Sequence, residues 1–449
     1  MFKQYRACAC EMFSSAICNL DCAYCYIPKT TEMKNIHQNI IHSLKTGSFL
    51  ENAKKLYDNR LEHLSLWGAE PTMILKELSK VLPQFFDAFP RLKSLSFSTN
   101  FVKNIDIMLD FIEKMPKDRS LEFKIQVSLD GPKEITDVNR GTGATEAIEK
   151  NINYFYKQLN EIDLGKIKFY SNLKPTWDGD NISLFYNDLT VLHRTVKYLK
   201  NFYKFLPPIS NKNISVHYVA CGTLALPGIY TVDDGRKWAR ICRELNKLDK
   251  EDGNKMCNSY LVYKMRIDRM LVLSKEYFNK FSMFTCSGGD SNWMLDDDGN
   301  IHICHRTAFS AKDKYIEEAL KVDKKNRDID YFKNGTLNLI KKNYIVNIDD
   351  QYEIDRLSYT MGGYHNFFKL KDSFNTAILT EMVLAGQANK CYLNKEFAGL
   401  FTMFMNNSFS CPAEALLTNG STHLIPVSII RLFANGAFEE IFKACLEEL

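Results

Sequence analysis

Short apolar runs alternate with longer stretches of helical spacing through the first half of the chain. The short runs predict strands, and these lie at Leu64–Trp67, Ser94–Ser98, Phe123–Leu129, Ile167–Leu173 and Ile214–Ala220. Helical spacing predicts helices between them, near Asn39–Tyr57, Ile74–Ala88, Ile105–Lys114, Thr145–Tyr156 and Leu184–Phe205. Repeated strand, helix, strand order favours an α/β fold with a parallel sheet and helices packed outside it.

The pattern changes after about Ala220. Residues 232–280 have helical spacing, and Asp298-Gly299 between two apolar runs predicts a hairpin, because such a turn needs positive φ. The Lys-, Asp- and Asn-rich segment 311–355 is typical of a solvated stretch, and residues 364–449 of a helical region. We therefore expect three units, residues 1–230, 231–310 and 311–449.

Polar residues end three of the predicted strands. The first run ends in Gly68-Ala69-Glu70, the next in Ser98-Thr99-Asn100, and a third in Ser128-Leu129-Asp130. Ligands of parallel α/β sheets bind beyond the carboxyl ends of the strands. Glu70 is placed to accept hydrogen bonds from an ammonium, while Ser128 and Asp130 offer oxygens to a ribose or an amine. Arg140 could fork onto a carboxylate. Each motif alone also fits an ordinary turn or strand end.

Three closely spaced cysteines, Cys18, Cys22 and Cys25, carry the most specific chemical signal. Three thiolates on one short loop can hold three irons of a 4Fe–4S cluster, whereas electron-transfer clusters usually have four cysteine ligands. The fourth iron is then open to another ligand. Zinc is the alternative, but its sites usually pair cysteines two residues apart with a second pair or histidines downstream.

Composition narrows the functional classes. The 449 residues include 58 basic and 54 acidic ones, a net charge of +4, which predicts no broad nucleic-acid footprint. No apolar run is long enough to span a bilayer, and the N-terminal segment lacks the apolar core of a signal peptide.

Thirteen cysteines without a secretory leader indicate reduced thiols, so we expect a cytoplasmic protein. We expect Cys8, Cys10, Cys221 and Cys242 to pack in the core.

These motifs resemble those of the radical S-adenosylmethionine (radical SAM) superfamily. The cysteine trio, with aromatic Tyr24 before its last member, matches the family's cysteine motif, and Gly68-Ala69-Glu70 matches its Gly-Gly-Glu motif with Ala in second place. Residues 126–140 resemble the branch that contains anaerobic sulfatase-maturing enzymes and peptide maturases. The similarity covers about residues 5–225 and 286–305.

The resemblance implies a partial (β/α)6 TIM-like barrel and a mechanism. S-adenosylmethionine would chelate the open iron, and one electron would split it into methionine and a 5′-deoxyadenosyl radical that abstracts hydrogen from a substrate carbon. The electron would come from an external donor such as flavodoxin or ferredoxin. The cofactor-binding residues expected from the family pattern are Tyr24, Gly68, Ala69, Glu70 (amino group), Ser98, Thr99, Ser128, Asp130, Arg140 (carboxylate) and Leu173.

A second cysteine set resembles the opening of the auxiliary-cluster region called SPASM or twitch. Cys286 is followed by Gly299 and Cys304, but the dense later cysteine series of a full SPASM region is missing. We therefore expect one auxiliary 4Fe–4S cluster in the C-terminal region, with Cys257 as the main substitute ligand. Its expected ligands are Cys286, Cys304, Cys391 and Cys411. Buried apolar thiols are the alternative.

His305 follows Cys304, where sulfatase-maturing relatives carry a proton-accepting aspartate. It could accept a proton near neutral pH or serve as a hydrogen-bonded structural residue, and the change weakens a sulfatase-specific assignment.

The expected function is modification of a peptide or protein side chain. Since only 17 residues precede Cys18, leader recognition would come from the C-terminal region or a separate protein. Two alternatives stay open, namely a radical enzyme acting on a small metabolite or carbohydrate, and a non-catalytic iron–sulfur or zinc protein. We expect neither a membrane nor nucleic acid as partner.

Overall fold

The computed structural model describes most of the first half of the chain and a few segments beyond it. These residues are 8–25, 27, 29, 31–217, 223–224, 237, 240–241, 244–245, 247–248, 292–296, 298–302, 346–347 and 349. The helices expected within 232–280 and 364–449 and the solvated stretch 311–355 therefore lie largely or wholly outside the described residues, and they stay predictions.

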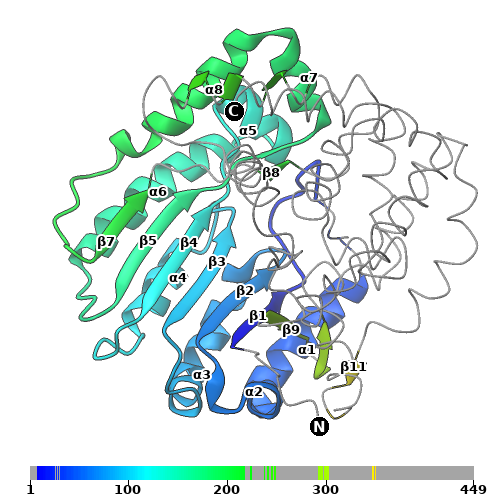
Figure 1. Ribbon diagram of the computed structural model, residues 1–449, viewed down its shortest axis with the longest axis vertical. Helices are drawn as coiled ribbons and strands as arrows, with labels where there is room; N and C mark the ends of the chain where they lie inside the picture. Colours follow the sequence, from blue (N-terminus) through cyan, green and yellow to red (C-terminus); the bar gives the residue numbers. More distant parts are fainter. Residues whose placement is uncertain are drawn as a thin grey trace, which may run out of the picture.

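One curved sheet forms the centre of the described part (Figure 1). Its strands follow the order β11-β10-β9-β1-β2-β3-β4-β5-β7, and each neighbouring pair from β1 to β7 is parallel. The parallel strands are β1 (Ala9–Ser15), β2 (His63–Gly68), β3 (Ser94–Thr99), β4 (Glu122–Val127), β5 (Lys168–Leu173) and β7 (Ile214–His217). This open arrangement confirms the parallel α/β sheet that the pattern predicts and the partial barrel that the resemblance implies. The strand before the cysteines, β1, was not predicted, because its sequence Ala-Cys-Glu-Met-Phe-Ser-Ser has neither a continuous apolar run nor a regular alternation of apolar and polar residues.

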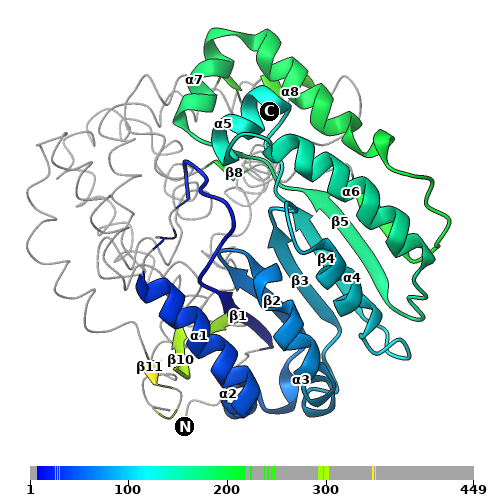
Figure 2. The same ribbon diagram turned by 180° about the vertical axis from the view of Figure 1, so that it is seen from behind.

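Helices connect the parallel strands, and most of them cover one face of the sheet (Figure 2). They are α1 (Thr31–Thr46), α2 (Ser48–Tyr57), α3 (Leu75–Ala88), α4 (Ile105–Glu113), α5 (Lys133–Arg140), α6 (Ala144–Glu161), α7 (Gly179–Asn187) and α8 (Leu189–Asn201). Short 3-10 turns lie at η1 (Asp58–Arg60), η2 (Pro71–Met73) and η3 (Phe202–Phe205), and a separate two-stranded pair joins β6 (Thr176–Trp177) to β8 (Thr223–Leu224).

The sequence predicts one continuous helix in each of two stretches, and both predictions were wrong because each stretch contains two helices. The stretch near Asn39–Tyr57 is divided at Gly47, whose φ of 80° is a left-handed conformation that ends one helix before the next begins. The stretch near Leu184–Phe205 is divided at Asp188, whose side chain accepts a hydrogen bond from the backbone N–H of Thr190 and caps the second helix. Periodicity alone does not show such breaks, because the apolar spacing continues across them.

Aromatic side chains pack between the helices and the covered face of the sheet. Phe123 on β4 lies between Phe97 and Phe169 of the neighbouring strands, with ring centroids 5.6 and 5.7 Å away. Phe155 of α6 packs on Phe169 at 5.8 Å. These rings are 3% exposed or less, so they form a continuous core that fixes the strand ends relative to one another.

The predicted hairpin is present and extends this same sheet. Strand β9 (Asn292–Leu295) pairs antiparallel with β10 (Asn300–His302), and Gly299 has a φ of 80°. The Asp296 carboxylate accepts hydrogen bonds from the backbone N–H groups of Asp298 (3.0 Å) and Asn300 (2.8 Å), which fixes the turn. β9 also runs parallel to β1, and β11 (Val346–Asn347) pairs with β10 at the sheet edge.

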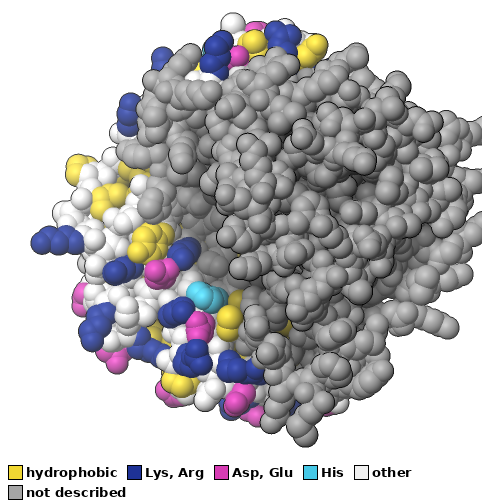
Figure 3. Space-filling model, viewed as in Figure 1, with side chains coloured by type: hydrophobic (Ala, Val, Ile, Leu, Met, Phe, Trp, Pro, Cys, Tyr) yellow, Lys and Arg dark blue, Asp and Glu magenta, His cyan; other side chains and the backbone are white. Residues whose placement is uncertain are grey.

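Among the described residues, no helix is both long and apolar enough to cross a membrane. Acidic and basic side chains are interspersed over the described surface on the face seen in Figure 3.

Candidate functional site

The cysteine loop and the motifs predicted at the strand ends meet at one edge of the sheet. The loop leaves the carboxyl end of β1, and the carboxyl ends of β2, β3 and β4 lie beside it in strand order. Residues more than 100 positions apart in sequence therefore contact one another here, as shown by the 2.9 Å hydrogen bond from the Tyr24 hydroxyl to Asp130.

Gly68 allows the end of β2 to lie directly against the end of β1. Its φ of 149° is a conformation that L side chains rarely adopt, and a Cβ on it would overlap the carbonyl oxygen of Ser15. The next two residues continue this contact, because the N–H of Ala69 donates to Ser15 O (2.7 Å) and that of Glu70 to Ile17 O (3.1 Å). The small residues of the Gly68-Ala69-Glu70 motif thus let its backbone hold the segment that immediately precedes Cys18.

Glu70 lies at the base of the site and is 2% exposed. Its Oε1 accepts hydrogen bonds from the N–H and the hydroxyl of Thr72 (3.2 and 2.8 Å), and its Oε2 accepts one from the N–H of Asn100 (2.8 Å). Burial raises the pKa of this carboxyl, while the hydrogen bonds oppose the rise. A buried carboxylate with these neutral donors favours a cation nearby.

The Cys18 thiol is held by the end of β3. Asn100 Nδ2 lies 3.5 Å from Cys18 Sγ and 2.9 Å from Asn19 Oδ1, and the N–H of Leu20 points at the same sulfur at 3.4 Å. Burial raises the pKa of Cys18 and raises that of Cys22 to about 11. A buried thiol stays protonated until a cation compensates the thiolate, as a bound metal centre does.

The other half of the cysteine loop is held by α5. The N–H of Ala23 donates to Asn139 O at 2.8 Å, and the Tyr24 hydroxyl donates to Asp130 Oδ2 at 2.9 Å. The guanidinium carbon of Arg140 lies 5.6 Å from the centroid of the Tyr24 ring. Within the loop, the N–H of Cys25 donates to Cys22 O at 3.0 Å, a turn that joins the backbones of the last two cysteines.

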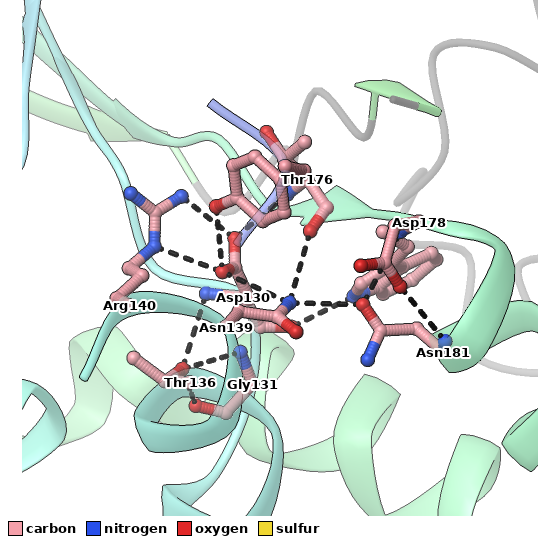
Figure 4. A network of polar contacts seen from close by, with 10 residues as sticks. Asp130, Gly131, Thr136, Asn139, Arg140, Thr176, Asp178 and Asn181 are labelled. Atoms are coloured by element: carbon pink, nitrogen blue, oxygen red, sulfur yellow. Dashed lines mark hydrogen bonds and ion pairs between the residues drawn. The ribbon is translucent and has the colours of Figure 1, made fainter. Parts of the chain in front are cut away.

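Asp130 is the centre of a buried polar network (Figure 4). Its oxygens accept a bidentate pair of bonds from Arg140, each 2.8 Å long, and further bonds from Asn139 Nδ2 (3.2 Å) and the N–H of Thr176 (2.8 Å). The fork expected of Arg140 is thus formed with a carboxylate of the protein itself. Burial opposes the charge of Arg140, but the Asp130 carboxylate raises the guanidinium pKa overall.

The remaining predicted contacts lie around this edge. Ser98 donates to Gln126 Oε1 at 3.0 Å, Thr99 accepts from the N–H of Phe101 at 3.1 Å, and the N–H of Ser128 donates to Thr99 O at 2.8 Å. Leu173, at the end of β5, is 1% exposed.

Several residues of the site were not predicted. Asn100 and Asn139 each join the cysteine loop to a strand end or to α5, and Thr136 accepts hydrogen bonds from the N–H groups of Asp130 (3.2 Å) and Gly131 (3.0 Å). Asn100 is the last residue of the Ser98-Thr99-Asn100 motif and Asn139 precedes Arg140, so position within or next to a motif was the signal that could have found them. Thr136 had no such signal.

The second cysteine set lies outside the described residues. This holds for Cys286, Cys304, Cys391, Cys411 and the substitute Cys257, as well as for His305. Cys10 is 1% exposed and packs in the core, as expected, while Cys8 is partly exposed. Cys221 and Cys242 lie outside the described residues too.

Among the described residues, no three His, Cys, Asp or Glu side chains are grouped as the ligands of one metal ion. The chemistry that bears on a cluster is that of the loop itself, three thiols beside a buried donor. Asn19 Nδ2, between two of the cysteines, is buried and has no hydrogen-bond partner among the described residues, so it can donate to an added acceptor such as a cluster sulfur.

Comparison with known proteins identifies the fold. No protein-family model and no curated protein matches the sequence. Among solved structures, the chain is similar to anSMEcpe with bound AdoMet (TM-score 0.52, 16% identity, 98% of this chain and 97% of that one). It also matches anSMEcpe with AdoMet and the Kp18Cys peptide (0.49, 16%, 98% and 97%) and Streptococcus suis SuiB bound to S-adenosylmethionine (0.47, 13%, 95% and 75%). The chain thus shares the fold of anSMEcpe, which confirms the α/β partial barrel that the resemblance implies.

Proposed function

We propose that this protein is a radical SAM enzyme that modifies a peptide or protein side chain. The observation that carries the proposal is the placement of the three-cysteine loop at the carboxyl edge of a parallel half-barrel, in a fold similar to that of an AdoMet-bound protein. That edge is where α/β sheets bind their ligands.

Cys18, Cys22 and Cys25 would each bind one iron of a 4Fe–4S cluster, and the open iron would take S-adenosylmethionine. When bound, the cluster and S-adenosylmethionine supply a 5′-deoxyadenosyl radical that abstracts hydrogen from the substrate. The protein's part is to hold the thiols and to shield them. Asn100 and the N–H of Leu20 donate to the Cys18 sulfur, and such hydrogen bonds stabilise thiolate ligands and tune a cluster's potential.

Glu70 is the residue that we assign to the amino group of S-adenosylmethionine. The carboxylate is buried, and its hydrogen bonds come from uncharged donors, Thr72 and the N–H of Asn100. An ammonium would therefore compensate its charge. Ser98, Thr99, Ser128 and Leu173 lie at the neighbouring strand ends and would line the same cofactor.

The peptide substrate is supported by the resemblance of residues 126–140 to the maturase branch. An auxiliary cluster on Cys286, Cys304, Cys391 and Cys411, proton acceptance by His305, and reduction by a flavodoxin or ferredoxin belong to the same proposal.

Anaerobic reconstitution with iron and sulfide tests the cluster. We expect about four irons per chain for one cluster and about eight for two, and, after reduction with dithionite, formation of 5′-deoxyadenosine from S-adenosylmethionine. Cys22→Ala should abolish 5′-deoxyadenosine formation, whereas Cys8→Ala, outside the loop, should keep it. Purified protein that holds zinc at the trio and forms no 5′-deoxyadenosine would overturn the proposal.

Glu70→Gln separates cofactor binding from cluster binding. The variant should retain the iron content of the wild type and lose most 5′-deoxyadenosine formation; unchanged cleavage would show that Glu70 does not hold the cofactor. The substrate class is tested with a short peptide encoded beside the gene. The peptide should increase the formation of 5′-deoxyadenosine, and its own mass should change. If only a small metabolite does so, the metabolite alternative is correct.

A further inference from the structure

The network around Asp130 points to a role that differs from the one expected from the family pattern. We propose that Asp130, together with Arg140 and Tyr24, positions the cysteine loop, and that the Asp130 side chain makes no contact with the cofactor. This inference rests on the proposed function, because it concerns the loop that would bind the cluster.

The hydrogen-bonding capacity of the Asp130 carboxylate is fully used by the protein. Oδ1 accepts from Arg140 Nη2 and from the N–H of Thr176, both at 2.8 Å. Oδ2 accepts from Arg140 Nε (2.8 Å), the Tyr24 hydroxyl (2.9 Å) and Asn139 Nδ2 (3.2 Å). A carboxylate offers about four lone-pair sites, and the residue is 0% exposed. No acceptor is left for a ribose or an amine.

The backbone of Asp130 is fixed as firmly as its side chain. Its N–H donates to the Thr136 hydroxyl at 3.2 Å, and its carbonyl accepts from the indole N–H of Trp177 at 2.8 Å. α5 and β6 therefore hold the carboxylate in one place, and the labelled residues of Figure 4 surround it from both sides. A rigid acceptor of this kind is suited to orienting another group.

The group that it orients is the Cys22–Cys25 half of the loop. Tyr24 lies between these two cysteines, and its hydroxyl bond to Asp130 joins positions 106 apart in sequence. The Arg140 guanidinium faces the Tyr24 ring at 5.6 Å, and the backbone bond from Ala23 to Asn139 adds a third attachment. Cys18 has its own support from Asn100. The trio is thus held at two separate points, one at each end.

Burial of the charged pair favours positioning over stability as its main role. Asp130 and Arg140 are 0% and 6% exposed, and such pairs gain little net stability because both charges lose water. What this pair adds is a fixed arrangement of the groups that it contacts, Tyr24 among them. Since the pair and Tyr24 form one network, removal of the hydroxyl should loosen the loop and leave the barrel folded.

Tyr24→Phe tests this directly, because it removes one hydroxyl and keeps the ring over Arg140. Its matched control is Tyr154→Phe, which removes a similar bond, 2.8 Å to Asp106 Oδ1, on the outer helices. In reconstituted protein, we expect Tyr24→Phe to release iron to a chelator about tenfold faster than the wild type. Tyr154→Phe should release iron at the wild-type rate, and the apo forms of both variants should melt at similar temperatures.

Electron paramagnetic resonance distinguishes positioning from cofactor contact. Addition of S-adenosylmethionine should change the spectrum of the reduced cluster in Tyr24→Phe as it does in the wild type. Wild-type iron retention, or loss of that spectral response with normal iron retention, would overturn the inference and leave the proposed function standing. If the wild type itself forms no four-iron cluster, the proposed function fails and this inference fails with it.

A double-mutant cycle adds a second readout. Asp130→Asn weakens the acceptor of the hydrogen bond that Tyr24→Phe removes, so the effects of the two substitutions on the iron-release rate should be non-additive. Additive effects would mean that the two residues act separately, contrary to the inference. Should Asp130→Asn not fold, the comparison of Tyr24→Phe with Tyr154→Phe decides alone.

Discussion

The two ends of the parallel strands carry the same kinds of charged side chain in opposite settings. At the carboxyl end, Asp130 and Arg140 are 0% and 6% exposed and are joined by two bonds of 2.8 Å. At the amino end, Glu62 pairs with Arg91 and Lys93, each of which is 57% exposed. Water screens the second group, so it contributes little to stability. Burial of the first group costs its hydration, which the hydrogen bonds of the pair offset, and we propose that the pair fixes the geometry of the cysteine loop.

The largest effect is expected from Arg140→Met, which leaves the Asp130 carboxylate buried without its cation. Loss of one partner of a buried pair destabilises a protein by about 3–5 kcal/mol. Urea denaturation of the apo protein measures the change in the free energy of unfolding. Arg91→Met at the amino end is the control, with an expected change below about 1 kcal/mol. Equal effects of the two substitutions would show that burial does not distinguish the two ends.

Gly68→Ala tests whether the backbone at the carboxyl end of β2 leaves no room for a side chain. The substitution combines an unfavourable φ of 149° with overlap of the new Cβ and the Ser15 carbonyl oxygen. We therefore expect the free energy of unfolding to fall by about 2–3 kcal/mol. Gly47→Ala is the matched control, since its φ of 80° is also unfavourable but no heavy atom lies within 4 Å of the added Cβ. It should lose only about 1 kcal/mol in the same urea measurement. No difference between the variants would contradict the proposed backbone contact.

Asp137 gives a pH-dependent effect of intermediate size at the carboxyl end. Burial acts to raise its pKa, but hydrogen bonds from Thr145 and the N–H of Gly143 lower it overall. Because the folded-state pKa is depressed, this stabilisation is present above the unfolded value of about 4 and is lost as the pH falls through the folded value. Asp137→Ala should therefore reduce the free energy of unfolding by about 1 kcal/mol at pH 7 and by progressively less below pH 4. Urea denaturation midpoints of both proteins across this range test whether the difference shrinks as the pH falls.

The smallest effect is expected from Glu62→Gln at the amino end. Lys93 and Arg91 lower the pKa of Glu62, but solvent screens these pairs, so the loss at pH 7 should stay below about 1 kcal/mol. It should shrink further in high salt, because the Debye length falls from about 10 Å at 0.1 M to about 3 Å at 1 M. If the free energy of unfolding fell nearly as much as in Arg140→Met, or if the change did not respond to salt, solvent would not be screening the pairs of Glu62.

The sequence by itself determined the parallel α/β order, the strands β2 to β5 and the residues at their carboxyl ends. These features depend on local information, namely apolar periodicity and the turn residues that follow each strand. The cysteine spacing likewise lies within eight consecutive residues, Cys18 to Cys25. The hairpin at Asp298-Gly299 was predictable for the same reason, because its turn chemistry is local.

Only the tertiary structure decided which groups these residues meet. Arg140 was expected to bind the carboxylate of the cofactor, whereas in this structure it pairs with Asp130. Gly68 was expected among the cofactor-binding residues, and the group that lies directly against it in this structure is the backbone of Ser15. The pairing of β1 with β9 joins residues about 280 positions apart. Such partners depend on how loops bring distant segments together and on which buried polar groups need hydrogen-bond partners there. The local pattern of apolar and polar residues predicts neither.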